Sequence, residues 1–284
     1  MKDLSKLKFP LNEKFGLIVL SNNVKYEFIL NIKHSDKLLV IGSGALPLDY
    51  REKFLNRPLF HRISWEFENS VIYYNDPTRY LNKELVGGWG LGTLENWYLN
   101  EISNIIKIIA NKIFKYNNEK EKFKNIIIYG SSMGGFMSLQ LSILIKNSTA
   151  IAEIPQLDLC EWHYWHTLKL LFENLDITEI KKKFNYKLNI MELITKEKYI
   201  PNAYLILDCS SQRDFETQYK NFFNNLNKLP FTENNNVNKI KIRIDGKNEG
   251  HKQLSKPEIY EFIENVCLII DNSQQDKNKK NDCE

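Results

Sequence analysis

Two adjacent serines stand between glycines in the stretch "GSSMGG", residues 130–135. A serine hydroxyl can attack a carbonyl carbon when a tight turn between a strand and a helix holds it outward. The residues two before and two after that serine must then be small. This spacing selects Ser132, because choosing Ser131 would put Tyr129 and Met133 at the crowded positions. The sequence therefore predicts Ser132 as a nucleophile; a Gly/Ser turn with a purely structural role is the alternative.

A serine nucleophile needs a histidine to accept its proton. Among five histidines, His251 lies late in the chain, in the polar turn "IDGKNEGHKQL" between a predicted strand and the last predicted helix. Such a loop is where a catalytic histidine is expected when the serine follows an earlier strand. We therefore expect His251 to be the base, and a surface histidine in a Gly/Asn-rich loop is the alternative.

An acid that orients the histidine should lie between the nucleophile and the histidine, near the end of the strand-like run "AYLILDC". Asp214 is the favoured candidate because it follows the polar turn "SSQRD" and can face back toward the histidine. Asp208 is still inside the run and is the second candidate. Glu216 is a further candidate, and Asp245, just before the histidine loop, is a weaker one.

Alternating strand and helix patterns predict the scaffold that must position these groups. Runs rich in β-branched and aromatic residues predict strands at 16–20, 26–32, 37–44, 70–76, 125–130, 149–154, 203–209 and 239–245. Apolar residues at helical spacing predict helices over 94–116, after the serine turn and over 257–270. This alternation predicts an open, mostly parallel α/β sheet flanked by helices.

The sequence also predicts how the fold begins and how it ends. The segment 26–41 is expected to form a hairpin-like entry to the sheet with His34 in its turn. One domain is expected over residues 1–270, and the polar residues 271–284 should form a disordered tail because they have almost nothing to bury.

Nearly fifty residues separate the strands at 149–154 and 203–209, which is too long for a simple crossover. We therefore predict a small helical insertion over 155–200. Within it, "CEWHYWH" places Trp162 and Trp165 beside two histidines, and aromatic faces there can line a substrate pocket. The two histidines have no third ligand close in sequence, so no metal site is expected.

The glycines of "GGWGLG", residues 87–92, do not have dinucleotide-binding spacing. We interpret the stretch as a flexible loop, with Trp89 as a candidate wall of the substrate pocket.

The order Ser132, Asp214, His251, with Gly-x-Ser-x-Gly after a buried strand and "EGHKQL" before the closing helix, resembles the α/β-hydrolase superfamily. The resemblance covers about residues 37–270, and the serine turn and the histidine loop are its most specific parts. It implies the α/β-hydrolase fold, with the helical insertion at 155–200 acting as a lid.

The resemblance also implies an oxyanion hole. One backbone N–H would come from Met133 and another from Ser43 or Gly44, just after the strand "KLLVIGSGA". The His-Gly pair usual in the family is replaced here by Gly42, Ser43 and Gly44, which leaves the second donor open. Relatives often have a glycine before the acid, where this chain has "SSQRD".

The pattern is similar to α/β-hydrolase-fold O-acetyltransferases and esterases that modify bacterial surface polysaccharides, including capsule enzymes. It implies a serine acyl-transfer enzyme that moves or removes an acetyl ester on a sugar or polysaccharide. No bound cofactor is implied, and acetyl-CoA is a candidate acyl donor. A small-molecule carboxylesterase or thioesterase is one alternative. A non-catalytic scaffold in a polysaccharide or secretion assembly is another, although the presence of serine, acid and histidine together counts against it.

The composition and charge of the chain argue against several other classes of protein function. Lysine and arginine number 39 against 35 acidic residues, a net charge of +4 without a basic stripe, so nucleic-acid binding is not expected. No window reaches the roughly 18 apolar residues of a membrane span. The charged N-terminus lacks the apolar core of a signal peptide, and the four cysteines lack metal-ligand spacing. We therefore expect a cytoplasmic protein that takes a small-molecule or glycan substrate; the sequence does not indicate an oligomeric state.

Overall fold

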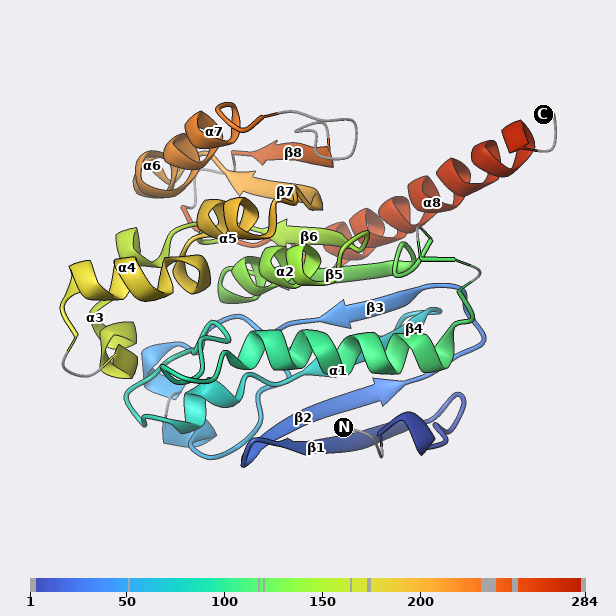
Figure 1. The fold of residues 1–284 in the computed structure, drawn as a ribbon, viewed down its shortest axis with the longest axis horizontal. Coiled ribbons are helices and arrows are strands. Elements are labelled where there is room, and N and C mark those ends of the chain that lie inside the picture. The colour runs from blue at the N-terminus through green and yellow to red at the C-terminus, as the bar shows by residue number, and fades with distance from the viewer. Residues whose placement is uncertain are drawn as a thin grey trace. The chain divides into compact units, whose positions relative to one another are not determined.

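The computed structural model describes residues 4–50, 52–116, 118–119, 121–163, 165–172, 175–230, 239–246 and 250–281 (Figure 1). The chain divides into two compact units, Met1–His251 and Lys252–Glu284. The serine, the histidine and all four candidate acids belong to the first unit, which is described first.

One eight-stranded sheet organises the first unit, in the order β1-β2-β4-β3-β5-β6-β7-β8. Its strands are β1 (Lys14–Ser21), β2 (Val24–Asn31), β3 (Leu38–Ile41), β4 (Ser70–Tyr74), β5 (Ile126–Ser131), β6 (Thr149–Glu153), β7 (Asn202–Asp208) and β8 (Ile240–Asp245). The pairs β1–β2 and β2–β4 are antiparallel, and every pair from β4 to β8 is parallel. The mostly parallel sheet predicted from the sequence is confirmed.

The entry to the sheet differs from the expectation. The predicted hairpin over 26–41 is wrong, because β2 pairs with β1 and β4 and not with β3. The hairpin turn lies instead at Asn22 and Asn23, whose φ values are 49° and 60°. Asparagine tolerates this left-handed region better than most residues, and a two-residue turn of this kind matches the twist of paired strands.

Helices connect the parallel strands. Those of the first unit include α1 (Tyr98–Ile113), α2 (Met133–Leu144), α3 (Trp165–Leu168), α4 (Ile177–Leu188), α5 (Ile190–Glu197), α6 (Gln212–Asp214) and α7 (Lys220–Leu226), with short turns η1 (Leu4–Lys6), η2 (Leu48–Tyr50), η3 (Glu52–Phe54), η4 (Pro77–Tyr80), η5 (Leu159–Glu161), η6 (Lys169–Phe172) and η7 (Phe215–Tyr219). Contacts run from α1 to α2, from α2 to α5 and from α5 to α7, which makes a continuous row of helices (Figure 1). Every residue of β3, β4, β5 and β6 is buried, as their continuous apolar runs predict.

The segment between β6 and β7 is largely helical and holds η5, α3, η6, α4 and α5. A capping box starts α4: the Asp176 carboxylate accepts a hydrogen bond from the Glu179 backbone N–H at 2.8 Å, and the Glu179 carboxylate accepts from the Asp176 N–H at 3.4 Å. Such reciprocal bonds satisfy donors that a helix start leaves unpaired. The function of this segment as a lid stays a prediction.

The second unit consists mainly of α8 (Lys256–Asn281). The sequence places the end of this helix at Ile270, whereas the structure continues it to Asn281. The extension mixes lysine and glutamine, which are good helix formers, with asparagine, aspartate and serine, which are weaker ones, so its sequence does not predict the helix. Residues 282–284 of the predicted tail lie outside the described residues, and the division into a domain and a tail stays a prediction. In the described part of the chain, no helix combines the length and the apolar character needed to cross a membrane.

Candidate active site

The turn between β5 and α2 holds Ser132 in an unusual backbone conformation. Its φ is 54° and its ψ is −115°, a combination that residues with a side chain rarely adopt. The Ser132 N–H donates to the Glu153 carbonyl at 2.8 Å, and the Ser132 carbonyl accepts from the Phe136 N–H at 3.0 Å. Ser131 ends β5, and its side-chain oxygen is buried without a hydrogen-bond partner among the described residues. The turn therefore separates the two serines into a partly exposed one and a buried one.

Close backbone contacts explain the glycines around Ser132. A Cβ atom on Gly130 would lie 2.3 Å from the carbonyl carbon and oxygen of Gly134. A Cβ atom on Gly134 would in turn lie 2.9 Å from the carbonyl oxygen of Ser43. Both neighbours are backbone atoms, which cannot rotate away as a side chain can. The space that a side chain at Gly130 or Gly134 would need is thus occupied by backbone atoms, which is why the turn requires small residues at these two positions.

Gly130→Ala should lower the free energy of unfolding by about 1–3 kcal/mol or more, because the added methyl group overlaps backbone. The measurement is the midpoint of thermal or denaturant unfolding. Gly16→Ala is the matched control, since a Cβ atom at Gly16 in β1 meets nothing within 4 Å. Its stability should stay within about 0.5 kcal/mol of the parent. Equal midpoints for the two variants would contradict the tight turn.

Three side chains that the sequence analysis selects lie in a continuous hydrogen-bonded chain. The Nε2 atom of His251 is 3.0 Å from the Oγ atom of Ser132. The Nδ1 atom of His251 is 2.7 Å from the Oδ2 atom of Asp214. Serine and histidine are separated by 119 positions in the sequence, so the fold and not local structure brings them together.

The carboxylate of Asp214 is held in its charged form. Burial alone would raise the pKa of Asp214, but the hydrogen bond and charge of His251, followed by Ser211 and Arg213, outweigh it and lower the pKa. An ionised Asp214 accepts a hydrogen bond from the Nδ1–H group of His251, which keeps the proton on Nδ1. The lone pair of Nε2 then faces Ser132, which is the arrangement that a general base needs.

The other candidate acids have different partners. Asp208 accepts hydrogen bonds from the backbone N–H and the hydroxyl of Ser210, at 2.9 and 2.6 Å. The Ser210 hydroxyl accepts in turn from the Gly250 N–H at 3.0 Å, which ties the turn after β7 to the residue before His251. Glu216 pairs with Lys220 at 2.9 Å, and Asp245 accepts from the N–H of Gly246 at 3.0 Å.

Backbone groups beside Ser132 are suited to binding an oxyanion. Met133 is the first residue of α2, so its N–H has no helical carbonyl to bind and lies at the positive end of the helix dipole. The Ser43 hydroxyl donates to the Leu59 carbonyl at 2.9 Å and accepts from the His61 N–H at 3.1 Å, which fixes the loop after β3. Whether the second donor is Ser43 or Gly44 stays a prediction.

The predicted pocket tryptophans occupy three different environments. The ring of Trp162 lies 5.4 Å from that of His251 and is 7% exposed. Trp165 packs against Phe172 at 5.9 Å within the insertion. Trp89 is only 1% exposed, so its ring is buried, and its role as a wall of the substrate pocket stays a prediction. In the part of the chain that the structure describes, no group of three or more His, Cys, Asp or Glu residues is arranged to hold a metal ion.

Gln156, which the sequence analysis missed, also contacts the serine. Its Nε2 atom donates to the Oγ atom of Ser132 at 2.9 Å, and its Oε1 atom accepts from the indole N–H of Trp89 at 3.0 Å. Gln156 follows the end of β6, at the sheet edge where the carboxyl ends of parallel strands meet. That edge is where α/β sheets bind ligands, so a polar residue just after a predicted strand was the available signal.

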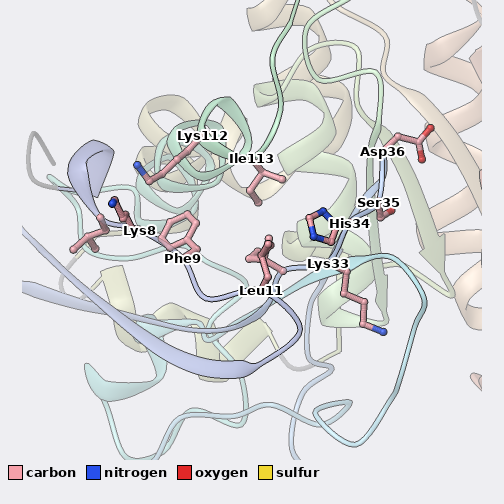
Figure 2. A pocket seen from close by; sticks show the side chains of 11 residues that line it. Lys8, Phe9, Leu11, Lys33, His34, Ser35, Asp36, Lys112 and Ile113 are labelled. Atoms are coloured by element: carbon pink, nitrogen blue, oxygen red, sulfur yellow. The ribbon is translucent and has the colours of Figure 1, made fainter.

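An open pocket with a volume of about 790 Å³ lies elsewhere on the first unit (Figure 2). Its lining comes from the segment before β1, the β2–β3 connection and the end of α1, and includes Lys8, Phe9, Leu11, Lys33, His34, Ser35, Asp36, Lys112 and Ile113. The β2–β3 connection precedes β3, whereas Ser132 follows β5. Because β3 and β5 are parallel, this pocket lies at the amino ends of these strands, whereas the serine lies at their carboxyl ends.

Comparisons with known proteins show the fold. No protein-family model matches the chain, and no curated protein matches its sequence. A solved structure of the capsule O-acetyltransferase of Neisseria meningitidis serogroup A is similar with a TM-score of 0.59 and 17% identity, over 88% of this chain and 96% of that one.

Two solved enzymes from Staphylococcus aureus are also similar. The fluorophosphonate-binding serine hydrolase F has a TM-score of 0.54 and 13% identity, over 92% of this chain and 99% of its own. The S-formylglutathione hydrolase has a TM-score of 0.52 and 15% identity, over 91% and 98%. With the strand order and the turn at Ser132, these similarities show that the chain has the α/β-hydrolase fold.

Proposed function

We propose that this protein is a serine acyl-transfer enzyme that forms an acyl-enzyme on Ser132. The observation that carries the proposal is the chain of two hydrogen bonds, from Ser132 to His251 at 3.0 Å and from His251 to Asp214 at 2.7 Å. A serine hydroxyl is a poor nucleophile at neutral pH, and this arrangement supplies the base and the acid that activate it. The similarity to solved serine hydrolases and to an O-acetyltransferase supports the same reaction class.

In the proposed reaction, Oγ of Ser132 bonds to the carbonyl carbon while its proton passes to Nε2 of His251. The electron pair of the carbonyl moves to its oxygen, which the N–H of Met133 and a second donor from Ser43 or Gly44 stabilise. When the tetrahedral intermediate collapses, the leaving group takes the proton from His251. An acceptor hydroxyl then gives its proton to His251 and attacks the acyl group, and Oγ leaves and is protonated again.

The reaction that we propose transfers an acetyl group from acetyl-CoA, the acyl donor, to a hydroxyl group of a sugar or a polysaccharide, so that the acetyl ester on the sugar is the product. Support comes from the similarity to the capsule O-acetyltransferase of Neisseria meningitidis, of which one similar structure is a complex with CoA. A carboxylesterase or thioesterase is the second candidate, because S-formylglutathione hydrolase is also among the similar structures. The two candidates differ in the acceptor, a sugar hydroxyl or water, and share the acyl-enzyme.

A fluorophosphonate probe should label the folded protein covalently, and the labelled peptide identified by mass spectrometry should contain Ser132. Such probes react with an activated serine and do not require the substrate to be known. Absence of labelling would favour a non-catalytic scaffold.

Release of CoA from acetyl-CoA, measured with and without an oligosaccharide acceptor, separates the two enzymes. A transferase should depend on the acceptor, and an equal rate without it would favour an esterase.

A further inference from the structure

We propose that Gln156 is a catalytic residue of the acyl transfer, because its side-chain amide donates to Oγ of Ser132 and sets the direction of attack. The inference rests on the proposed function of the site. Gln156 is fully buried, three positions after the end of β6, and neither a serine–histidine–acid chain nor backbone oxyanion donors require it.

The orientation of the Gln156 amide follows from its partners. Its Oε1 and Nε2 atoms have similar shapes, so the hydrogen bonds must tell them apart. The indole nitrogen of Trp89 can only donate, and it lies 3.0 Å from one end of the amide. That end must be the oxygen. The other end, 2.9 Å from Ser132, is therefore the NH₂ group, which donates to Oγ.

This donor leaves one free direction at Oγ. A hydroxyl oxygen has a bond to carbon, a bond to hydrogen and two lone pairs. At Ser132 the hydrogen points to Nε2 of His251, and one lone pair accepts from Gln156. Among the residues that the structure describes, no other group forms a hydrogen bond with Oγ, so the second lone pair is left to bond to an acyl carbon. Gln156 and His251 together thus orient the nucleophile before the substrate arrives.

The same N–H group is placed to stabilise charge on Oγ. While the proton moves to His251 and the new bond to carbon is incomplete, Oγ carries more negative charge than in the free hydroxyl. Hydrogen bonds to charged oxygens are stronger than those to neutral ones. Deacylation passes through the same charged Oγ in reverse, so Gln156 should accelerate both half-reactions.

Two sets of contacts hold Gln156 in place. On one side, the loop 87–92 carries Trp89, and this loop is fixed by hydrogen bonds from the Gly90 N–H to Asp76 at 2.9 Å and from the Gly92 N–H to Thr78 at 3.0 Å. Trp89 itself has a φ of 48°, so the loop keeps it in a conformation it would rarely adopt alone.

On the other side, the backbone N–H groups of Leu157 and Asp158 both donate to Oε1 of Gln218, at 2.8 and 2.9 Å. Gln218 lies in η7, directly after α6, which ends at Asp214. The residues that follow Gln156 are thus tied to the element that carries the acid. A donor held from both sides loses little freedom during the reaction, which is what effective stabilisation of charge requires.

Gln156→Leu should lower the rate constant of fluorophosphonate labelling, and kcat for p-nitrophenyl acetate, by about 10- to 100-fold, as expected for one hydrogen bond to a charged atom. KM should change much less. Gln140→Leu is the matched control, because Gln140 is also fully buried and its amide donates to the Lys187 carbonyl at 3.0 Å, away from the serine. It removes a buried amide, so its stability should fall while its labelling rate stays within about twofold of the parent.

Gln156→Glu provides a second readout if the leucine variant does not fold. A neutral carboxyl group can still donate to Ser132, whereas an ionised one cannot. The labelling rate of this variant, divided by that of the parent at each pH, should therefore rise as the pH falls. A constant ratio near one would overturn the inference, as would equal labelling of Gln156→Leu and Gln140→Leu. Failure of the parent protein to label would instead overturn the proposed function.

Discussion

Ser132→Ala should abolish fluorophosphonate labelling and lower kcat for p-nitrophenyl acetate by about 10⁶-fold. The substitution removes the atom that carries the acyl group and leaves His251, Asp214 and the backbone donors in place. Those remaining groups can still bind an ester and stabilise an oxyanion, so a small residual rate over water is expected. Alanine meets the same backbone strain as serine at a φ of 54°, so the fold should persist, which circular dichroism can check.

Ser131→Ala is the control for this prediction. Ser131 is the neighbouring residue, has the same side chain and is fully buried at the end of β5. Its hydroxyl has no hydrogen-bond partner among the described residues, so removing it should leave both labelling and kcat close to those of the parent. Labelling that survives in Ser132→Ala and disappears in Ser131→Ala would reverse the assignment of the nucleophile.

Asp214→Asn should lower kcat by about 10⁴-fold, because an amide next to Nδ1 no longer fixes the histidine tautomer that a base needs. The pKa of Asp214 is lowered in the folded protein, so its charged form stabilises the fold at neutral pH. That contribution is present above the ordinary carboxyl pKa of 3.8 and is lost as the pH falls through the lower folded value. The stability difference between the parent and the variant should therefore shrink in acid, measured as thermal unfolding against pH.

Asp208→Asn separates the two leading acids. An asparagine at this position keeps an oxygen that can accept from Ser210, so the turn beside Gly250 should survive and kcat should fall by about tenfold at most. Near-normal activity in Asp214→Asn, together with collapse in Asp208→Asn, would move the role of the acid to Asp208.

Much of the sheet could be predicted because its signal is local. Continuous apolar runs such as "NIIIYG" mark buried parallel strands whatever their partners are, and the glycines at 130 and 134 record a steric demand of the turn itself. The chain order of serine, acid and histidine placed all three after strands of one sheet. Parallel strands end at a common edge, so their grouping followed from topology.

The features that escaped prediction depend on partners distant in sequence. The local sign of Gln156 is weak, a polar residue just after a predicted strand, and its partner Trp89 lies 67 positions earlier. The glycine-rich stretch around Trp89 suggests a flexible loop. Those glycines instead allow tight packing: a Cβ atom on Gly88 would lie 2.3 Å from Thr78. The hairpin expected over 26–41 also failed, because strand order within a sheet is decided by packing that a single segment does not encode.

The 119 positions between Ser132 and His251 have a consequence for biosynthesis. A ribosome adds about 5–20 residues each second, so the hydroxyl leaves the exit tunnel roughly 6–24 s before the imidazole does. During that interval the nascent chain exposes Ser132 but not His251, which accepts the proton of the serine. A nascent chain should therefore not react with esters or thioesters in the cell until translation has passed β8 and His251 has left the tunnel.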